Sequence, residues 1–195
     1  LNVTVNNATG STLTAARGTT FTTTVDGTSY NYIVKDAATI TPVDGVYTFS
    51  SLPVYEGTLI NNTYTVDTSN ADQRFLIKND LADTTTLKVT VQNSSTDSTS
   101  NTYTLASDLS DITSTSKVYY LEGAEDNQYE VKFGDGVLGA ALSTGNIVTL
   151  SYVVTNAEES NGASSFSLSG SIGGFSNVTI TTATNSANGA QPETP

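Results

Sequence analysis

Apolar and polar side chains alternate over short stretches along most of the chain, which is the pattern of half-buried β-strands. Asp26-Gly27 separates two such runs, one from Phe21 to Val25 and one from Tyr30 to Val34, and this combination is typical of a tight β-hairpin. A second pair, Asp44-Gly45, precedes another alternating run. Long stretches of strong helix formers are absent, so the sequence predicts an all-β fold built from small antiparallel β-sandwich-like modules.

Polar breaks divide the chain into three predicted parts. A first β module is expected over residues 1–72 and a second over residues 73–157. Residues 158–195 are predicted to be an extended segment, either an incomplete third unit or a linker, and residues 183–195 contain few apolar side chains and are expected to be poorly ordered without a partner. One helical turn at most is expected, between Ser107 and Ile112, with Ser107 as its cap.

Composition narrows the possible functions. The chain has no Met, which predicts an internal or processed segment of a longer protein. It also has no Cys and no His, so the usual nucleophiles, proton shuttles and zinc ligands are missing. The net charge of −12 disfavours nucleic acid and anionic membrane as partners, and no apolar run is long enough to span a bilayer. We therefore predict a water-soluble, non-catalytic segment that uses no cofactor.

Two kinds of acidic site remain as alternatives to solvated surface carboxylates. Glu56 or Glu130 could belong to a carboxylate pair of the kind that hydrolyses glycosides, which sequence does not exclude. A calcium site is the other alternative, although the acidic residues lack the spacing of a calcium-binding loop. Its candidate ligands are Asp108, Asp111, Glu122, Glu125 and Asp126.

A glycine-rich stretch follows the predicted strand that ends at Phe133. A phosphate cradle would need a helix after it, but residues 137–139 and then another strand follow, so a structural turn is the better interpretation. We expect Phe133 to face the core, Asp135 to lie at the tip, and Leu138 and Leu142 to close over the end of the module. Gly136→Val should then cost about 1–3 kcal/mol of stability if φ is positive at this position. The predicted turn motif consists of Phe133, Gly134, Asp135, Gly136 and Gly139.

The same stretch carries a resemblance to a known family. Residues 73–79, 86–92 and 118–122, followed by the most specific stretch at residues 129–139, are similar to the baseplate J-like family of phage baseplate wedge proteins. Leu142, residues 145–148, Tyr152 and residues 161–163 continue the similarity, which is dense over about residues 73–165.

The resemblance implies a structural virion protein in the tail baseplate of a contractile-tailed bacteriophage, assembled in the host cytoplasm. Its implied partners are its own copies, as a homodimer or ring, and other baseplate wedge proteins. It also implies that the protein joins wedges into a ring and rearranges when the sheath contracts. The family supplies no catalytic residue to carry over, and for this chain we predict no cofactor and no metal site.

A second class of function stays open beside this one. Thr/Ser/Asn-rich β domains without Cys are also typical of Ig-like or adhesin-type surface domains that bind carbohydrate or a receptor. The Phe-Gly-Asp-Gly neighbourhood separates the two hypotheses, because adhesin domains have no reason to carry it.

Overall fold

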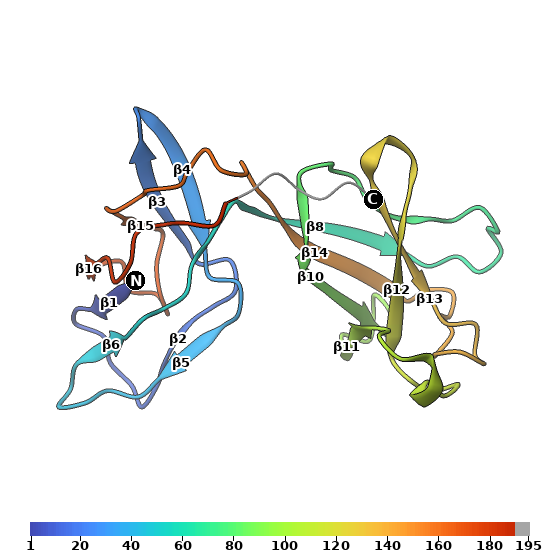
Figure 1. The fold of residues 1–195 in the computed structure, drawn as a ribbon. Coiled ribbons are helices and arrows are strands. Elements are labelled where there is room, and N and C mark those ends of the chain that lie inside the picture. The colour runs from blue at the N-terminus through green and yellow to red at the C-terminus, as the bar shows by residue number, and fades with distance from the viewer. Residues whose placement is uncertain (190–195) are drawn as a thin grey trace. The chain divides into compact units, whose positions relative to one another are not determined.

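The computed structural model describes residues 1–189 and is all-β, which confirms the predicted fold class (Figure 1). Sixteen strands and two short 3₁₀ turns make up the regular structure of these residues. None of the helical segments in this range has the length and apolarity needed to cross a bilayer.

The described residues form two compact units, each with its own hydrophobic core. Among the described residues, unit 1 comprises Leu1–Leu59 together with residues 155–189, and unit 2 comprises Ile60–Val154. The predicted division at residues 72 and 157 is therefore replaced by one in which unit 1 is built from two separated stretches of sequence.

Unit 1 contains three small sheets, with strand orders β16-β1-β6, β15-β3-β4-β7 and β2-β5. The alternating side chains of these strands, among them the fully buried Phe21 and Phe49, fill a single core. The strands are β1 (Asn2–Val5), β2 (Leu13–Ala15), β3 (Thr20–Val25), β4 (Thr28–Ile33), β5 (Ala38–Ile40), β6 (Tyr47–Phe49), β7 (Tyr55–Glu56), β15 (Ser167–Ser169) and β16 (Val178–Thr181).

The predicted hairpin at Asp26-Gly27 joins β3 to β4. Both turn residues have positive φ, 49° for Asp26 and 85° for Gly27, and Val25 pairs with Thr28 across the turn. Asp44 and Gly45 also have positive φ and connect Val43 and Val46, which form an isolated antiparallel bridge. Left-handed backbone at both central positions matches the twist of a hairpin, and Asp-Gly tolerates it.

Residues 155–189 are part of unit 1, so the prediction of an incomplete third unit or linker is wrong for the described residues. β15 pairs with β3, and β16 pairs with β1 with Val3 opposite Ile180. Ile172 is fully buried in the unit 1 core. The buried hydroxyl of Tyr32 lies 2.9 Å from both the carbonyl oxygen and the Oγ of Ser160. The expectation about order in residues 183–195 falls, for residues 190–195, outside the described part of the chain.

Unit 2 is a seven-stranded sheet in the order β8-β14-β10-β11-β12-β13-β9. Its neighbouring strands are antiparallel where their register is defined, except that β11 and β12 run parallel. The edge strands β8 and β9 lie close to each other at one point, where the Tyr64 hydroxyl donates a 2.6 Å hydrogen bond to the Leu76 carbonyl. The elements are β8 (Thr58–Thr65), β9 (Phe75–Ile77), β10 (Ala82–Gln92), β11 (Ser100–Leu105), η1 (Leu109–Asp111), β12 (Val118–Gly123), η2 (Glu125–Asn127), β13 (Tyr129–Phe133) and β14 (Ile147–Val154).

The expected helical turn is the 3₁₀ turn η1, but its cap is Asp108 and not Ser107. The Asp108 carboxylate accepts the backbone N–H of Ser110 at 2.9 Å, and a carboxylate one position before the turn reaches this donor. Leu105 and Leu109 are both exposed, so this turn does not contribute them to the core.

A break in the ladder between β10 and β14 is filled by one buried hydroxyl. The register shifts between Asp83 and Lys88, and Thr86 lies in the interruption. Its Oγ1 donates to the Asp83 carbonyl at 2.6 Å and accepts the Val153 N–H at 2.9 Å. The side chain therefore supplies the hydrogen bond that the interrupted backbone ladder lacks.

Replacing Thr86 with valine should destabilise unit 2 by about 1–3 kcal/mol, because the shape is kept while the buried Val153 N–H loses its acceptor. Urea unfolding followed by circular dichroism measures the effect. Thr86→Ser is the matched control, since it keeps the hydroxyl and loses one methyl group worth about 0.8 kcal/mol. A valine variant at least as stable as the serine variant would remove this account of the break.

Candidate interaction site

The predicted turn motif lies at one end of unit 2, where β13 ends and β12 begins. Tyr119, near the start of β12, pairs with Phe133, the last residue of β13. The β12–β13 hairpin turn is consequently at the opposite end of these two strands (Figure 1). Phe133 packs edge to face on Phe75 and Tyr103, with ring centroids 5.3 and 5.5 Å apart, and this contact anchors the start of the loop in the core.

Two glycines allow the loop to cross itself at its base. A Cβ placed on Gly134 would lie 2.2 Å from the Gly139 carbonyl carbon and 2.5 Å from its Cα, which are impossible distances. Gly139 has φ +90° and is buried against Val118, whose Cγ2 would be 2.9 Å from an added Cβ. Both positions need glycine because backbone passes where a side chain would be.

Backbone hydrogen bonds hold the tip in one conformation. The Gly136 N–H donates to the Gly139 carbonyl at 3.0 Å, and Gly136 has φ +88°. The Asp135 carboxylate accepts the N–H groups of Val137 and Leu138 at 2.9 and 3.0 Å. The conformation of the tip is therefore stabilised by hydrogen bonds between groups of the loop itself.

The carboxylate at the tip remains ionised to unusually low pH. Hydrogen bonds from the backbone N–H groups of Leu138 and Val137 lower the pKa of Asp135 from the ordinary value of 3.8. Because the pKa is lower in the folded state, ionised Asp135 stabilises the folded protein, and this stabilisation is fully present above pH 3.8. It is lost as the pH falls through the lower value of the folded protein.

We therefore expect the Asp135 carboxyl carbon, followed by NMR, to titrate below pH 3.8 in the folded chain. The amide signals of residues 137 and 138 should shift in the same pH range. Asp135→Asn is the matched control, because its side-chain oxygen still accepts hydrogen bonds but does not titrate, so the shifts should vanish. A titration at or above the ordinary value would contradict the two hydrogen bonds.

The loop projects apolar side chains into solvent. Val137 is 71% exposed and Leu138 is 47% exposed, whereas Leu142 packs against the unit 2 core. The expectation that Leu138 closes over the end of the module is therefore wrong, and Leu142 alone does so. Leu138 is held outward because its N–H is bonded to Asp135 and its carbonyl accepts the Tyr120 hydroxyl at 3.3 Å.

A second loop, residues 106–117, supports the first. The Gly139 N–H donates to the Thr113 carbonyl at 3.1 Å, and the Ala140 N–H donates to the Ser116 carbonyl at 2.8 Å. This second loop carries the exposed Leu109, and Leu105 immediately precedes it. The two loops thus form one continuous structure at this end of unit 2.

A groove of about 590 Å³ lies next to the base of the motif. Its walls are residues 66–68 and 70–75 on one side and residues 130–134 with Leu142 on the other. β9 pairs with β13 only as far as Val131, so the chain before Phe75 diverges from β13 and opens this space. Phe75 and Phe133 contribute apolar surface, and the rest of the lining mixes apolar, uncharged polar and charged side chains.

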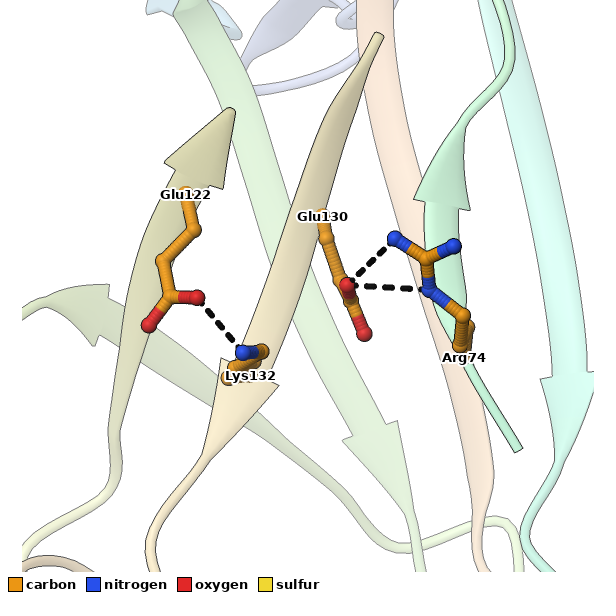
Figure 2. A network of polar contacts seen from close by, with 4 residues as sticks. All are labelled: Arg74, Glu122, Glu130 and Lys132. Carbon is orange, nitrogen blue, oxygen red and sulfur yellow. Dashed lines mark hydrogen bonds and ion pairs between the residues drawn. The ribbon is translucent and has the colours of Figure 1, made fainter. Parts of the chain in front are cut away.

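The cations of the groove are already paired with carboxylates, as Figure 2 shows. Arg74 donates from Nε and Nη2 to Glu130 Oε2 at 3.0 and 2.8 Å, and Lys132 Nζ lies 2.5 Å from Glu122 Oε2. These hydrogen bonds raise the pKa of both Arg74 and Lys132. Any anion that entered the groove would compete with Glu130 and Glu122 for these two cations.

The sequence did not predict this four-residue network. Alternation along residues 129–133 places Glu130 and Lys132 on the same outer face, which is a usable signal. The partners come from β12 and from the residue before β9, so only the strand register identifies them.

The acidic alternatives are dispersed in the structure. Asp108 caps η1, Glu122 pairs with Lys132, and Glu130 pairs with Arg74. Glu56 accepts hydrogen bonds from the backbone N–H and the side chain of Asn156 within unit 1. Within residues 1–189, no three acidic side chains gather in a group that could hold a metal ion.

Comparison with known proteins gives no assignment. No model of a protein family matches the chain, and no curated protein matches it significantly.

Proposed function

We propose that this chain is a structural, non-catalytic segment of a baseplate wedge protein from a contractile-tailed bacteriophage. In this role it joins wedges into a ring through contacts with its own copies and with other wedge proteins. It takes part in the rearrangement that accompanies sheath contraction. The proposal places the protein in the virion, at the tail baseplate.

The observation that carries the proposal is the loop at Phe133–Gly139. Its sequence is the part of the chain that most closely resembles the baseplate J-like family. Its geometry suits assembly, because two glycines and one carboxylate fix a tip that exposes Val137 and Leu138. Rigid exposed apolar side chains favour contacts with other proteins over chemistry.

The reading frame and its neighbours test this assignment most cheaply. The proposal predicts that the longer frame continues on at least one side of residues 1–195 and is flanked by genes for a tail sheath, a tail tube and other wedge proteins. A secretion signal together with a cell-wall anchor in the same frame would overturn it.

The groove favours one alternative, an adhesin-type domain that binds carbohydrate or a receptor. It has the size of a ligand pocket and combines apolar walls with polar groups. Glycan-array binding separates the two functions, since the leading proposal predicts no glycan signal. A signal that disappears in Phe75→Ala, with unit 2 still folded, would support the alternative.

A further inference from the structure

We propose that the two loops at the motif end of unit 2 form a docking surface for a basic protein partner that offers an apolar pocket. The centre of this surface is Leu109, Val137 and Leu138. The inference rests on the proposed function, because it names a surface through which an assembly protein would bind a different subunit.

Exposed apolar side chains are concentrated on these loops. Of the eight large apolar side chains that are exposed in residues 1–189, three lie on these loops, Leu109, Val137 and Leu138, and a fourth, Leu105, immediately precedes residues 106–117. The loops that carry them are joined by the two backbone hydrogen bonds from Gly139 and Ala140. Solvent-exposed apolar groups gathered in this way mark binding surfaces on soluble proteins.

The surface is also ordered before any partner arrives. The N–H groups of residues 136–140 are all hydrogen-bonded within the unit. A flexible tip would lose conformational entropy on binding, whereas this tip has lost it on folding. A loop that only reversed the chain would not need this ordered structure. The two-residue turn at Asp26-Gly27 reverses the chain without it.

Charge identifies the kind of partner. Asp108 and Asp111 flank Leu109, and Asp135 lies beside Val137. The single lysine of the two loops, Lys117, is directed to Asn101 Oδ1 at 2.5 Å. The charged side chains next to the apolar centre are thus mainly acidic, which favours a partner with a basic rim and repels acidic ones.

A second copy of the chain fits this surface poorly. The chain has a net charge of −12, so two copies repel each other. The two cations of the groove, Arg74 and Lys132, are already bound to Glu130 and Glu122. We therefore assign this surface to a different subunit and leave self-association to other parts of the chain.

NMR titration of the isotope-labelled full chain tests the proposal with three synthetic peptides of equal length. One peptide combines Lys and Arg with Leu and Phe, one replaces its apolar residues with serine, and one replaces its basic residues with glutamate. The first should shift the amide signals of residues 109–113 and 136–140, with an affinity about tenfold higher than either of the others. Its binding should weaken as salt is raised.

Val137→Asp should reduce the affinity for the basic apolar peptide about tenfold or more. Val43→Asp is the matched control, because Val43 is 72% exposed at a hairpin tip of unit 1, and it should leave binding unchanged. Both changes are at exposed positions, and unchanged amide spectra elsewhere show that the variants fold.

Three results would overturn the docking surface: no binding of the basic apolar peptide at millimolar concentration, shifts confined to other residues, or equal binding by wild type and Val137→Asp. None of them touches the proposed function, which depends on the reading frame and its neighbours. Conversely, a cell-wall anchor in the frame would end the wedge assignment while leaving the measured binding in place.

Discussion

Gly134→Ala is expected to unfold unit 2 or to lower its free energy of unfolding by roughly 3 kcal/mol or more, the range of the most damaging single substitutions. The added methyl group would be placed 2.2 Å from the Gly139 carbonyl carbon and 2.3 Å from its oxygen. Backbone on both sides of this crossing is fixed, by β13 before it and by the bonds to Thr113 and Ser116 after it. The clash between the added methyl group and the Gly139 backbone is therefore relieved only if the loop separates from the end of unit 2.

Two other glycines provide matched controls for this result. Gly136→Ala keeps a φ of +88° and meets only the Ala141 Cβ at 3.8 Å, so it should cost about 1–2 kcal/mol, the strain of left-handed backbone alone. Gly145→Ala, with φ +91° and open space around it, should behave in the same way. Urea unfolding with NMR assignment of the unit that unfolds measures all three. Equal losses for Gly134→Ala and Gly136→Ala would contradict the crossing at the base of the loop.

Ending the chain at Val154 is expected to unfold unit 1 and leave unit 2 folded. The deletion removes β15 and β16, which flank β3 and β1, and takes Ile172 and Ala163 from the core. It also removes Ser160, so the buried Tyr32 hydroxyl loses its partners. A stretch of 59 residues deprived of two sheet edges has too little apolar surface to bury to remain folded.

Amide spectra of the shortened chain provide the measurement. Signals of unit 2 should keep their positions, because its core is drawn from residues between Ile60 and Val154. Signals of unit 1 should collapse to the shifts of unfolded peptides. Ile172→Ala is the milder companion, with an expected loss of about 2–5 kcal/mol from unit 1 only. A shortened chain with unit 1 intact would restore the independent first module that the sequence predicts.

The features that the sequence predicts correctly depend on residues close together along the chain. The Asp26-Gly27 hairpin depends on six residues on each side and on two positions that tolerate positive φ, all within one stretch. The same holds for Phe133 facing the core and for the glycines of the motif, because alternation and turn chemistry act over a few residues.

The features that the sequence does not predict depend on pairing between segments that are far apart along the chain. Val3 pairs with Ile180, and nothing in either segment identifies the other. The parallel pairing of β11 with β12 follows from the path of residues 106–117, which turn chemistry alone does not define. Leu138 is apolar and near the end of a strand, so its burial is the default expectation, and only the Asp135 and Tyr120 hydrogen bonds keep it outside.

The cap of η1 is a further feature that the sequence does not predict correctly. Ser107 and Asp108 are both good caps, and a shift of one residue decides which side chain reaches the free N–H of Ser110. For the candidate site, the sequence therefore locates the motif, while the exposed surface and the charge network require the register of three strands.

We propose that this chain is a structural part of a phage tail baseplate, and peptide mass spectrometry of purified particles is the decisive experiment. Contractile tails are separated from lysed producing cells by density gradient, and each fraction is quantified for peptides from residues 1–195. We expect these peptides to occur with sheath and tube proteins in the tail fraction, at a constant ratio to them in every preparation. Peptides confined to the cell-wall fraction, with none in purified tails, would contradict it.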